Sequence, residues 1–158
     1  MTRIDELRNE VTTLADRTAS AKELMQAMAK MLHDRMLKYN WVGFYLLEPG
    51  ADPPMLVLGA FEGAMTPHTR IPLNQGICGA AASSGETVVV DDVNKDPRYL
   101  ACSLETKSEI VVPIFVRGKV IGELDIDSHF PAAFSTEHQE FVRHCADVIG
   151  KKLEAASA

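Results

Sequence analysis

The sequence contains no hydrophobic run long enough to cross a membrane. A spanning helix needs roughly 20 consecutive apolar residues, and no run in this chain approaches that length. The stretch from Met1 to Glu10 mixes acidic and basic side chains, so it does not resemble a secretory signal. The net charge is −6 and the basic residues form no stripe. We therefore expect neither a membrane nor a nucleic acid as a partner.

Cysteine is also scarce. The chain has three cysteines, an odd number, and it contains no CxxC motif. This usage does not fit a disulfide framework and predicts a cytoplasmic protein, whose cysteines are free, catalytic or redox-active. The spacings of 10 and 24 residues between His68, Cys78 and Cys102 match no compact zinc motif, so we expect no metal site.

The chain has the composition of an ordinary globular domain. Its 158 residues, 46% of them hydrophobic and 24% charged, are enough for one domain with a real core. Hydrophobic periodicity and turn residues then predict an α+β fold with an antiparallel sheet flanked by helices. The predicted elements are two helices within residues 3–38 that break near residue 20, strands over 41–47, 55–61, 69–73 and 87–91, a short helix from 76 to 85, a hairpin of strands over 109–116 and 120–127, and a C-terminal helix from 136.

Three acidic residues are predicted to meet on one face of the hairpin. Side chains alternate between the two faces of a strand, so Asp125 and Asp127 share a face, and the opposite face is apolar. If the apolar faces of the two strands coincide, Val116 lies opposite Val120 across a three-residue turn. Glu109 then lies opposite Asp127. A slip of one residue would turn the acids into the helix-covered core, so this register should be firmly fixed.

Two interpretations of this acidic face are possible. It could be an exposed sheet face, on which carboxylates cost little free energy. Alternatively, it is the floor of a partly covered pocket, which is favoured because Val111, Pro113, Phe115 and Ile121 are expected on the same face. In a pocket, at least one carboxyl should have a raised pKa and stay protonated near neutrality. Such a group can donate a proton to a leaving oxygen.

The three cysteines and the single tryptophan have different sequence surroundings. Cys145 lies on the apolar side of the C-terminal helix and is expected to be a core residue. Cys78 enters the short helix, where it is either a packed small residue or a thiol whose pKa the helix N-terminus lowers. Cys102 lies in a polar connection and could be reactive or inert. Trp41 could be a core ring or a pocket wall.

Several short segments occur together in a recognisable order. They are Asn40-Trp41-Val42-Gly43-Phe44-Tyr45, Arg70-Ile71-Pro72, Gly76-Ile77-Cys78-Gly79, Asp91-Asp92-Val93, Ala101-Cys102, Ser108-Glu109-Ile110-Val111-Val112-Pro113 and Leu124-Asp125-Ile126-Asp127-Ser128. With them the chain resembles a GAF domain and, more narrowly, the free methionine-(R)-sulfoxide reductase family. The resemblance implies a GAF domain over residues 20–158, after an N-terminal helical segment over residues 1–19. It also implies a six-stranded antiparallel sheet with N- and C-terminal helices, and a homodimer.

The resemblance further implies an activity and a role for each matching residue. The family reduces free L-methionine-(R)-sulfoxide to methionine with a cysteine thiol, without a bound cofactor, through a sulfenic acid and a disulfide. Cys102 takes the position of the catalytic cysteine, and Cys78 that of a second redox cysteine. The implied substrate-binding residues are Trp41, Tyr45, Glu109, Asp125 and Asp127. Thioredoxin is the expected external reductant and free methionine sulfoxide the expected ligand.

The chain departs from the family pattern at three places, one of which is the Pro-rich stretch Pro49 to Pro54, a longer loop than usual. The family has a resolving cysteine just before the Arg-Ile-Pro segment, where this chain has His68. Around the catalytic cysteine the family tends to have Gly-His-Ile-Ala-Cys-Asp, whereas residues 98–103 here read Arg-Tyr-Leu-Ala-Cys-Ser. The alternative function is therefore a non-catalytic GAF module that binds a small amino-acid-like ligand.

Overall fold

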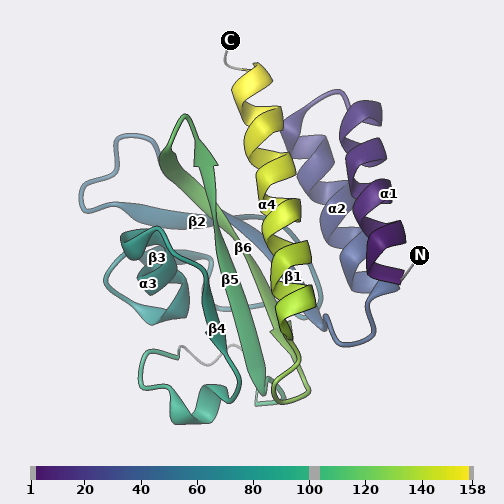
Figure 1. Cartoon of the computed structure of the whole chain (residues 1–158). Helices are drawn as coiled ribbons and strands as arrows, with labels where there is room; N and C mark the ends of the chain where they lie inside the picture. The colour runs from purple at the N-terminus through teal and green to yellow at the C-terminus, as the bar shows by residue number, and fades with distance from the viewer. Residues whose placement is uncertain (1–2, 100–103, 157–158) are drawn as a thin grey trace.

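A six-stranded antiparallel sheet with the strand order β3-β2-β1-β6-β5-β4 forms the centre of the computed structural model, which describes residues 3–99 and 104–156 (Figure 1). The elements in chain order are α1 (Arg3–Arg17), α2 (Ala21–Arg35), β1 (Trp41–Leu47), β2 (Met55–Glu62), β3 (Arg70–Pro72), α3 (Gly76–Ser84), β4 (Val88–Val90), the 3-10 helix η1 (Val93–Lys95), β5 (Ser108–Val116), β6 (Lys119–Ser128) and α4 (Thr136–Ala156). The predicted fold class is confirmed. Among the described residues, no helix combines the length and the apolarity that spanning a bilayer requires.

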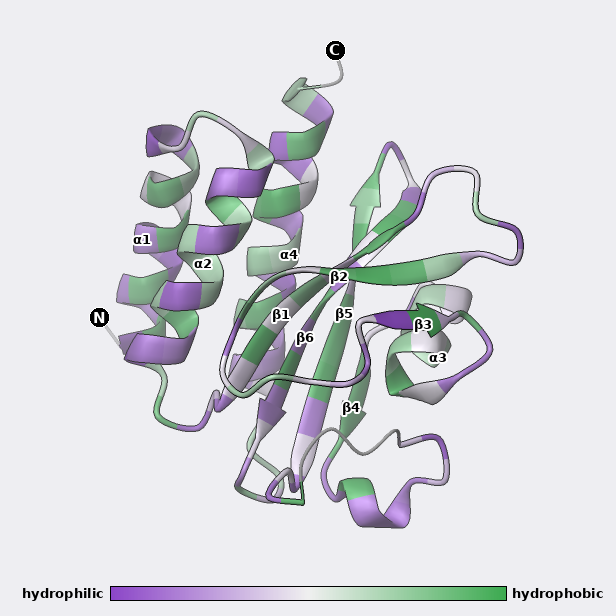
Figure 2. Cartoon of the chain, turned by 180° about the vertical axis from the view of Figure 1, so that it is seen from behind, coloured by the Kyte–Doolittle hydropathy of each residue, from purple (hydrophilic) through white to green (hydrophobic). Residues whose placement is uncertain are grey.

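Helices α1, α2 and α4 cover one face of the sheet, and α3 lies on the other (Figure 1). The three long helices are amphipathic, as their alternating green and purple bands in Figure 2 show. Their apolar residues, such as Leu7, Leu24 and Ile149, join the sheet in one buried cluster. The predicted break before α2 is confirmed, because the Ser20 side chain accepts a hydrogen bond of 3.1 Å from the backbone N–H of Glu23. Such a cap contributes about 1 kcal/mol to stability.

The predicted register of the hairpin is confirmed at the end that carries the acids. Ile110 pairs with Ile126, and Glu109 pairs with Asp127. This register is fixed because Ile110 and Ile126 are buried only if both face the helices. The central strands are accordingly green in Figure 2, with purple near the ends of β5 and β6 that lie beside each other.

The predicted register is wrong at the turn. Val116 pairs with Lys119, so the connection has two residues rather than three. Both Arg117, with a φ of 51°, and Gly118, with a φ of 77°, adopt left-handed conformations. Two such residues form the tight turn whose twist matches that of the flanking strands, and this turn replaces the wider one that apolar matching alone predicts.

An irregularity in the pairing between Ile114 and Phe115 reconciles the tight turn with the register at the acidic end. A β-bulge of this kind places one extra residue on one strand. Consequently Ile121 packs against the helix-side cluster and Val120 against the α3-side cluster, the reverse of the prediction. The bulge lies between the turn and the acids, so it leaves the acidic residues in their predicted places.

Two apolar clusters therefore lie on opposite faces of one sheet. The larger one is shared with α1, α2 and α4. The smaller one lies between the sheet and α3 and includes Trp41, Tyr45, Cys78 and Val111. We call the surface beneath α3 the pocket face; its members on the three central strands are Trp41, Tyr45, Glu109, Val111, Glu123, Asp125 and Asp127. The boundary between an N-terminal segment and a domain at residue 20 stays a prediction, and α1 packs into the larger cluster.

Candidate functional site

Four carboxyl groups lie buried on the pocket face. Glu109, Glu123, Asp125 and Asp127 are each no more than 4% exposed. Three of them alternate along β6, and Glu109 reaches the row from β5, opposite Asp127. The structure thus brings together the three acids that the sequence predicted and excludes the interpretation as an exposed sheet face. Their burial agrees with a covered pocket.

Burial raises the pKa values of the four buried acids above those of exposed carboxyls. Burial, followed by the charges of Asp125 and Asp127, raises the pKa of Glu109 well above its usual range. Burial and the charge of Asp125 likewise raise the pKa of Asp127. Burial also raises the pKa of Asp125, but hydrogen bonds from Glu109 and Cys78 to this carboxylate oppose the shift. Asp125 is therefore the member of the cluster best placed to carry a negative charge, while the raised pKa values of Glu109 and Asp127 favour their protonated forms.

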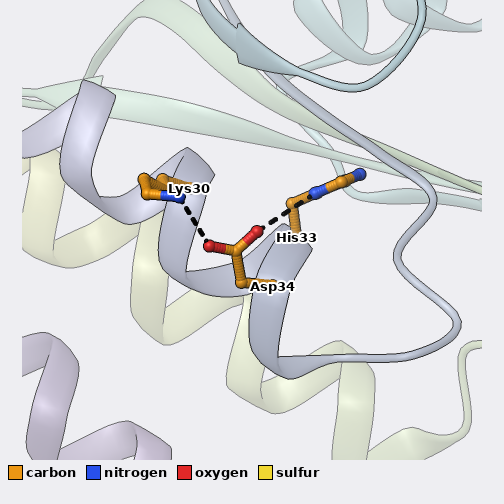
Figure 3. Close-up of polar contacts among 3 residues, drawn as sticks. All are labelled: Lys30, His33 and Asp34. Carbon is orange, nitrogen blue, oxygen red and sulfur yellow. Dashed lines mark hydrogen bonds and ion pairs between the residues drawn. The ribbon is translucent and has the colours of Figure 1, made fainter.

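An exposed aspartate on α2 shows the contrast. In Figure 3 the carboxylate of Asp34 points between Lys30 and His33, at 2.8 Å from Lys30 Nζ and 3.5 Å from His33 Nδ1. The hydrogen bond from Lys30 lowers the pKa of Asp34. None of the salt bridges among residues 3–99 and 104–156 involves the four pocket acids. The pocket acids are thus buried without the cation that an acid of this kind normally requires.

Cys78 lies above the acids, on α3. Its Sγ donates a hydrogen bond of 3.4 Å to Oδ2 of Asp125. Burial, followed by the carboxyls of Asp125, Glu123 and Glu109, raises the pKa of this thiol. The alternative in which the helix N-terminus lowers the pKa is therefore wrong for this arrangement. Cys145 is a buried core residue, as predicted, and burial raises the pKa of its thiol.

Cys102, the predicted catalytic residue, lies outside the described residues. The chain that flanks it on both sides reaches the pocket. Tyr99 packs against the cluster that contains Cys78. Thr106 and Glu105 line a cavity together with Asp127. The catalytic role of Cys102 stays a prediction.

Two aromatic residues of β1 line the pocket beside the acids. Trp41 pairs with Asp127 on β6, and its Nε1 donates a hydrogen bond of 3.0 Å to the carbonyl of Ala64. Tyr45 donates a hydrogen bond of 2.7 Å to the carbonyl of His68. Between them, Gly43 leaves space for the indole, because a Cβ there would lie 2.2 Å from the Trp41 ring. Trp41 therefore serves as a pocket wall, and its interactions fix the ring in place.

Two small cavities adjoin the row of acids. One, of about 20 Å³, is lined among others by Tyr45, His68, Cys78, Glu109 and Asp125. It has room for about one water molecule. The other, of about 100 Å³, is lined among others by Trp41, Thr66, Glu105, Asp127 and His129. Glu109 and Asp125 therefore line one cavity and Asp127 lines the other.

The same groups also form a set of potential metal ligands. One thiol sulfur and two carboxylate oxygens, from Cys78, Glu109 and Asp125, lie within 4.8 Å of one another. Zinc accepts such donors, although its structural sites usually have four protein ligands. The arrangement equally suits an organic ammonium group, which needs carboxylate acceptors and no fixed geometry.

Glu123 is the residue of the pocket face that sequence reasoning did not select. It is fully buried between its strand neighbours Tyr45 and Pro113, and neither of its carboxyl oxygens has a hydrogen-bond partner among the described residues. The signal was present in the sequence, since Glu123 alternates in step with Asp125 and Asp127.

Comparison with known proteins places this chain in a family. A family model described as GAF domain matches residues 20–153. The free methionine-R-sulfoxide reductase of Escherichia coli is 37% identical over 78% of this chain and 72% of its own length. The structure of the Neisseria meningitidis free methionine-R-sulfoxide reductase in complex with its substrate superposes with a TM-score of 0.90, at 35% identity, and covers 98% of this chain and 90% of that chain. The fRMsr of Staphylococcus aureus, also in complex with substrate, superposes with a TM-score of 0.86, at 36% identity and 97% coverage of both chains.

Proposed function

The chain belongs to the GAF family, and within it to the free methionine-R-sulfoxide reductases, and from this membership we propose that it reduces free L-methionine-(R)-sulfoxide to methionine. A shared fold does not by itself fix an activity, so the proposal depends on the site. The observation that carries it is the row of buried acids without a cation, with a thiol hydrogen-bonded to one of them. Such a row suits a ligand that brings a positive charge and a group to be protonated.

The acids provide for both ends of this substrate. Asp125, whose ionised form is stabilised by two hydrogen bonds, would accept the α-ammonium group together with a neighbouring carboxyl. A residue within a peptide has no α-ammonium group, which explains a preference for the free amino acid. Trp41 and Tyr45 would form the apolar wall against which the side chain of the substrate packs. Glu109 or Asp127, which stay protonated, would face the sulfoxide oxygen.

In the proposed reaction the Cys102 thiolate attacks the sulfoxide sulfur. The protonated carboxyl donates its proton to the sulfoxide oxygen, and the carboxylate recovers a proton from the thiol of the next cycle. The oxygen is transferred to Cys102, methionine leaves, and Cys102 remains as a sulfenic acid. The sulfoxide sulfur is thereby reduced by two electrons and the Cys102 sulfur is oxidised by two.

Recycling would use the second cysteine. Cys78 would condense with the sulfenic acid, releasing water and forming a disulfide, which thioredoxin would then reduce. This bond requires the two Cα atoms to lie within about 7 Å of each other. A small thiol could resolve Cys102 instead, since His68 stands where the resemblance expects a further cysteine. The reductant, the homodimer and the cytoplasmic location stay predictions.

Turnover with thioredoxin, thioredoxin reductase and NADPH tests this function. Wild-type protein should consume NADPH with the R epimer of free methionine sulfoxide and not with the S epimer. Replacing Cys102 by Ser should abolish turnover, because the hydroxyl is a far weaker nucleophile than a thiolate. Cys145→Ser is the matched control and should remain active, since Cys145 lies in the helix-side core. Full activity of Cys102→Ser would contradict the assignment.

A second candidate is a GAF module that binds an amino-acid-like ligand without chemistry. It is favoured by one observation: Cys78 is a protonated, hydrogen-bonded thiol in a cavity of about 20 Å³ beside His68. Calorimetry with methionine and both sulfoxide epimers separates the two functions. Binding without any methionine formed from the sulfoxide would establish the module and exclude the reductase.

A further inference from the structure

Cys78, Glu109 and Asp125 form a compact set of potential metal donors inside the protein. One thiol sulfur and two carboxylate oxygens lie within 4.8 Å of one another, and the three residues come from α3, β5 and β6. They are 6%, 4% and 2% exposed, so each side chain is more than nine-tenths buried. Only Cys78 belongs to the set whose sequence spacing matched no zinc motif. Spacing along the chain could not reveal a set that the folded sheet and α3 bring together.

The distances between these donors are close to those of a coordination sphere. With a Zn–S bond of about 2.3 Å and Zn–O bonds of about 2.0 Å, the donor atoms of a tetrahedral site lie about 3.5 Å apart. Sγ of Cys78 already lies 3.4 Å from Oδ2 of Asp125, in a hydrogen bond whose proton a metal ion would replace. Glu109 lies within 4.8 Å of both, so a small rotation of its carboxyl group completes the sphere.

An unpartnered oxygen and a small cavity point to the same place independently. Oδ1 of Asp125 is buried and has no hydrogen-bond partner among residues 3–99 and 104–156. Beside it lies the cavity of about 20 Å³ that Cys78 and Glu109 also line, with room for about one water molecule. In the described part of the chain no salt bridge reaches these carboxyls. A metal ion would supply the positive charge, and the cavity would hold a water molecule as its fourth ligand.

The fold holds all three donors in place. Gly79, the residue after Cys78, lies so close to the turn after β3 that a Cβ there would be 2.8 Å from the carbonyl oxygen of Leu73. Glu109 and Asp125 are fixed by the pairing of β5 with β6. Donors carried by packed helices and strands keep a more precise geometry than donors on loops.

We propose that Cys78, Glu109 and Asp125 bind one zinc ion, as a thiolate and two carboxylates, with water in the fourth position. The thiolate favours zinc over magnesium and calcium, which prefer oxygen donors. Metal ligands bind deprotonated, so the protons of the thiol and the carboxyls are released to solvent as the ion enters. The ion would occupy the carboxylate assigned to the ammonium group of the sulfoxide. Ion and substrate would therefore exclude each other, a consequence that rests on the proposed function.

The absorption spectrum of Co²⁺, which replaces zinc in tetrahedral sites, tests the thiolate ligand in the fully reduced protein. A thiolate-to-cobalt charge-transfer band should appear and saturate at one ion per chain. Zn²⁺ should remove the band and excess Mg²⁺ should not. Cys78→Ser should lose the band, whereas Cys145→Ser should keep it, since Cys145 lies in the helix-side core. A band that persists in Cys78→Ser, or that Mg²⁺ removes, would overturn the proposal.

Two glutamates of the same row test the carboxylate ligands. Glu109→Gln keeps the side-chain volume and removes an anionic donor. We expect its affinity for Zn²⁺, measured by displacement of Co²⁺, to fall by at least about tenfold, because even outer-shell changes at metal sites cost about 10- to 100-fold. Glu123→Gln is the matched control and should keep the wild-type affinity, since Glu123 is equally buried but is not one of the three donors.

Circular dichroism verifies that each variant is folded before its metal affinity is compared. Equal affinities of Glu109→Gln and Glu123→Gln would contradict the assigned donors. These titrations contain no sulfoxide, so their outcome is independent of whether the protein is a reductase.

Discussion

The two faces of the β5–β6 hairpin are buried to the same extent and differ in what is buried. Toward α1, α2 and α4 the strands present Ile110, Ile114, Leu124 and Ile126, all 0% exposed. Toward α3 they present four acids that are no more than 4% exposed. Burying an apolar side chain of this size contributes about 1.5 to 3 kcal/mol, whereas a buried unpaired polar group costs about 1 to 3 kcal/mol. Burial alone therefore does not distinguish a core from a site.

The comparison also explains why both faces can exist on one strand. Because side chains alternate between the faces, apolar residues and acids follow one another along the same strand. Burial of the helix-side residues stabilises the fold and offsets the free-energy cost of the buried acids. The protonated form of the acids reduces the free-energy cost of burying them. A ligand with an ammonium group would supply the positive charge that these acids otherwise lack. The following predictions test this division between the faces, beginning with the largest effect.

An acid should be tolerated on one face and not on the other. Leu124→Asp places a carboxyl in the helix-side core, where hydrophobic side chains surround it. We expect a loss of more than about 4 kcal/mol in the free energy of unfolding, enough to unfold most of the protein. Urea denaturation followed by circular dichroism measures it. A stable Leu124→Asp protein would contradict the assignment of the two faces.

Removing an acid should harm activity and spare stability. In Asp125→Asn the charge that would bind the ammonium group and accept the Cys78 hydrogen is lost. We expect kcat/KM for the sulfoxide to fall by about 100-fold, equivalent to about 2.7 kcal/mol, which lies within the range for loss of a hydrogen bond to a charged group. The unfolding free energy should stay equal or rise. Asp34→Asn, on the exposed side of α2, is the control and should leave kcat/KM unchanged.

Stability should fall as the pH rises through the neutral range. The pKa values of Glu109, Asp127 and Glu123 are raised in the folded protein, chiefly by burial, so the folded state holds protons that the unfolded chain releases. Their stabilising contribution is complete below the ordinary carboxyl pKa and is lost as the pH rises toward the raised pKa values. Each such proton contributes a slope of about 1.4 kcal/mol per pH unit.

Thermal unfolding between pH 5 and 9 measures this slope. The Tm of the wild type should decline across the range, and Glu123→Gln should make the decline shallower by removing one titrating group. A Tm that increases toward pH 9 would show that the acids are ionised and paired in the folded state.

A methyl group at Gly43 should produce the smallest effect, confined to the pocket face. Its Cβ would lie 2.2 Å from the Trp41 ring, which must move. We expect a cost of about 1 to 3 kcal/mol, a higher KM and a shifted tryptophan emission. Gly59→Ala is the matched control, because the nearest atom to its Cβ, the Phe44 carbonyl oxygen, lies at an ordinary 3.5 Å. Equal emission shifts in both variants would contradict the role of Gly43.

Much of the fold and part of the site follow from the sequence. Apolar alternation was sufficient to pair Glu109 with Asp127, because Ile110 and Ile126 have one buried solution. The turn was mispredicted because it depends on the backbone of Arg117 and Gly118, which hydrophobic matching does not consider. The turn is one residue shorter than predicted, and the β-bulge between Ile114 and Phe115 compensates for this difference, so the pairing of the acids is unchanged.

The remaining site features depend on contacts between distant segments. The pKa of Cys78 is raised first by burial and then by carboxyls on β5 and β6 that α3 meets only in the folded chain, so local reasoning about the helix N-terminus gave the wrong direction. The isolation of Glu123 likewise depends on which side chains fail to reach it. The role of Cys102 followed from resemblance, since its loop has no periodicity that would place it.

The most direct test of the pocket face as a reductase site is a single turnover without an external reductant. Fully reduced protein is mixed with excess free L-methionine-(R)-sulfoxide, and the methionine formed is counted per chain by mass spectrometry. A rapid burst of one methionine per chain, absent from Cys102→Ser and strongly slowed in Asp125→Asn, is the predicted result. Binding of the sulfoxide with no methionine formed would contradict the account and leave the acids as a ligand-binding surface only.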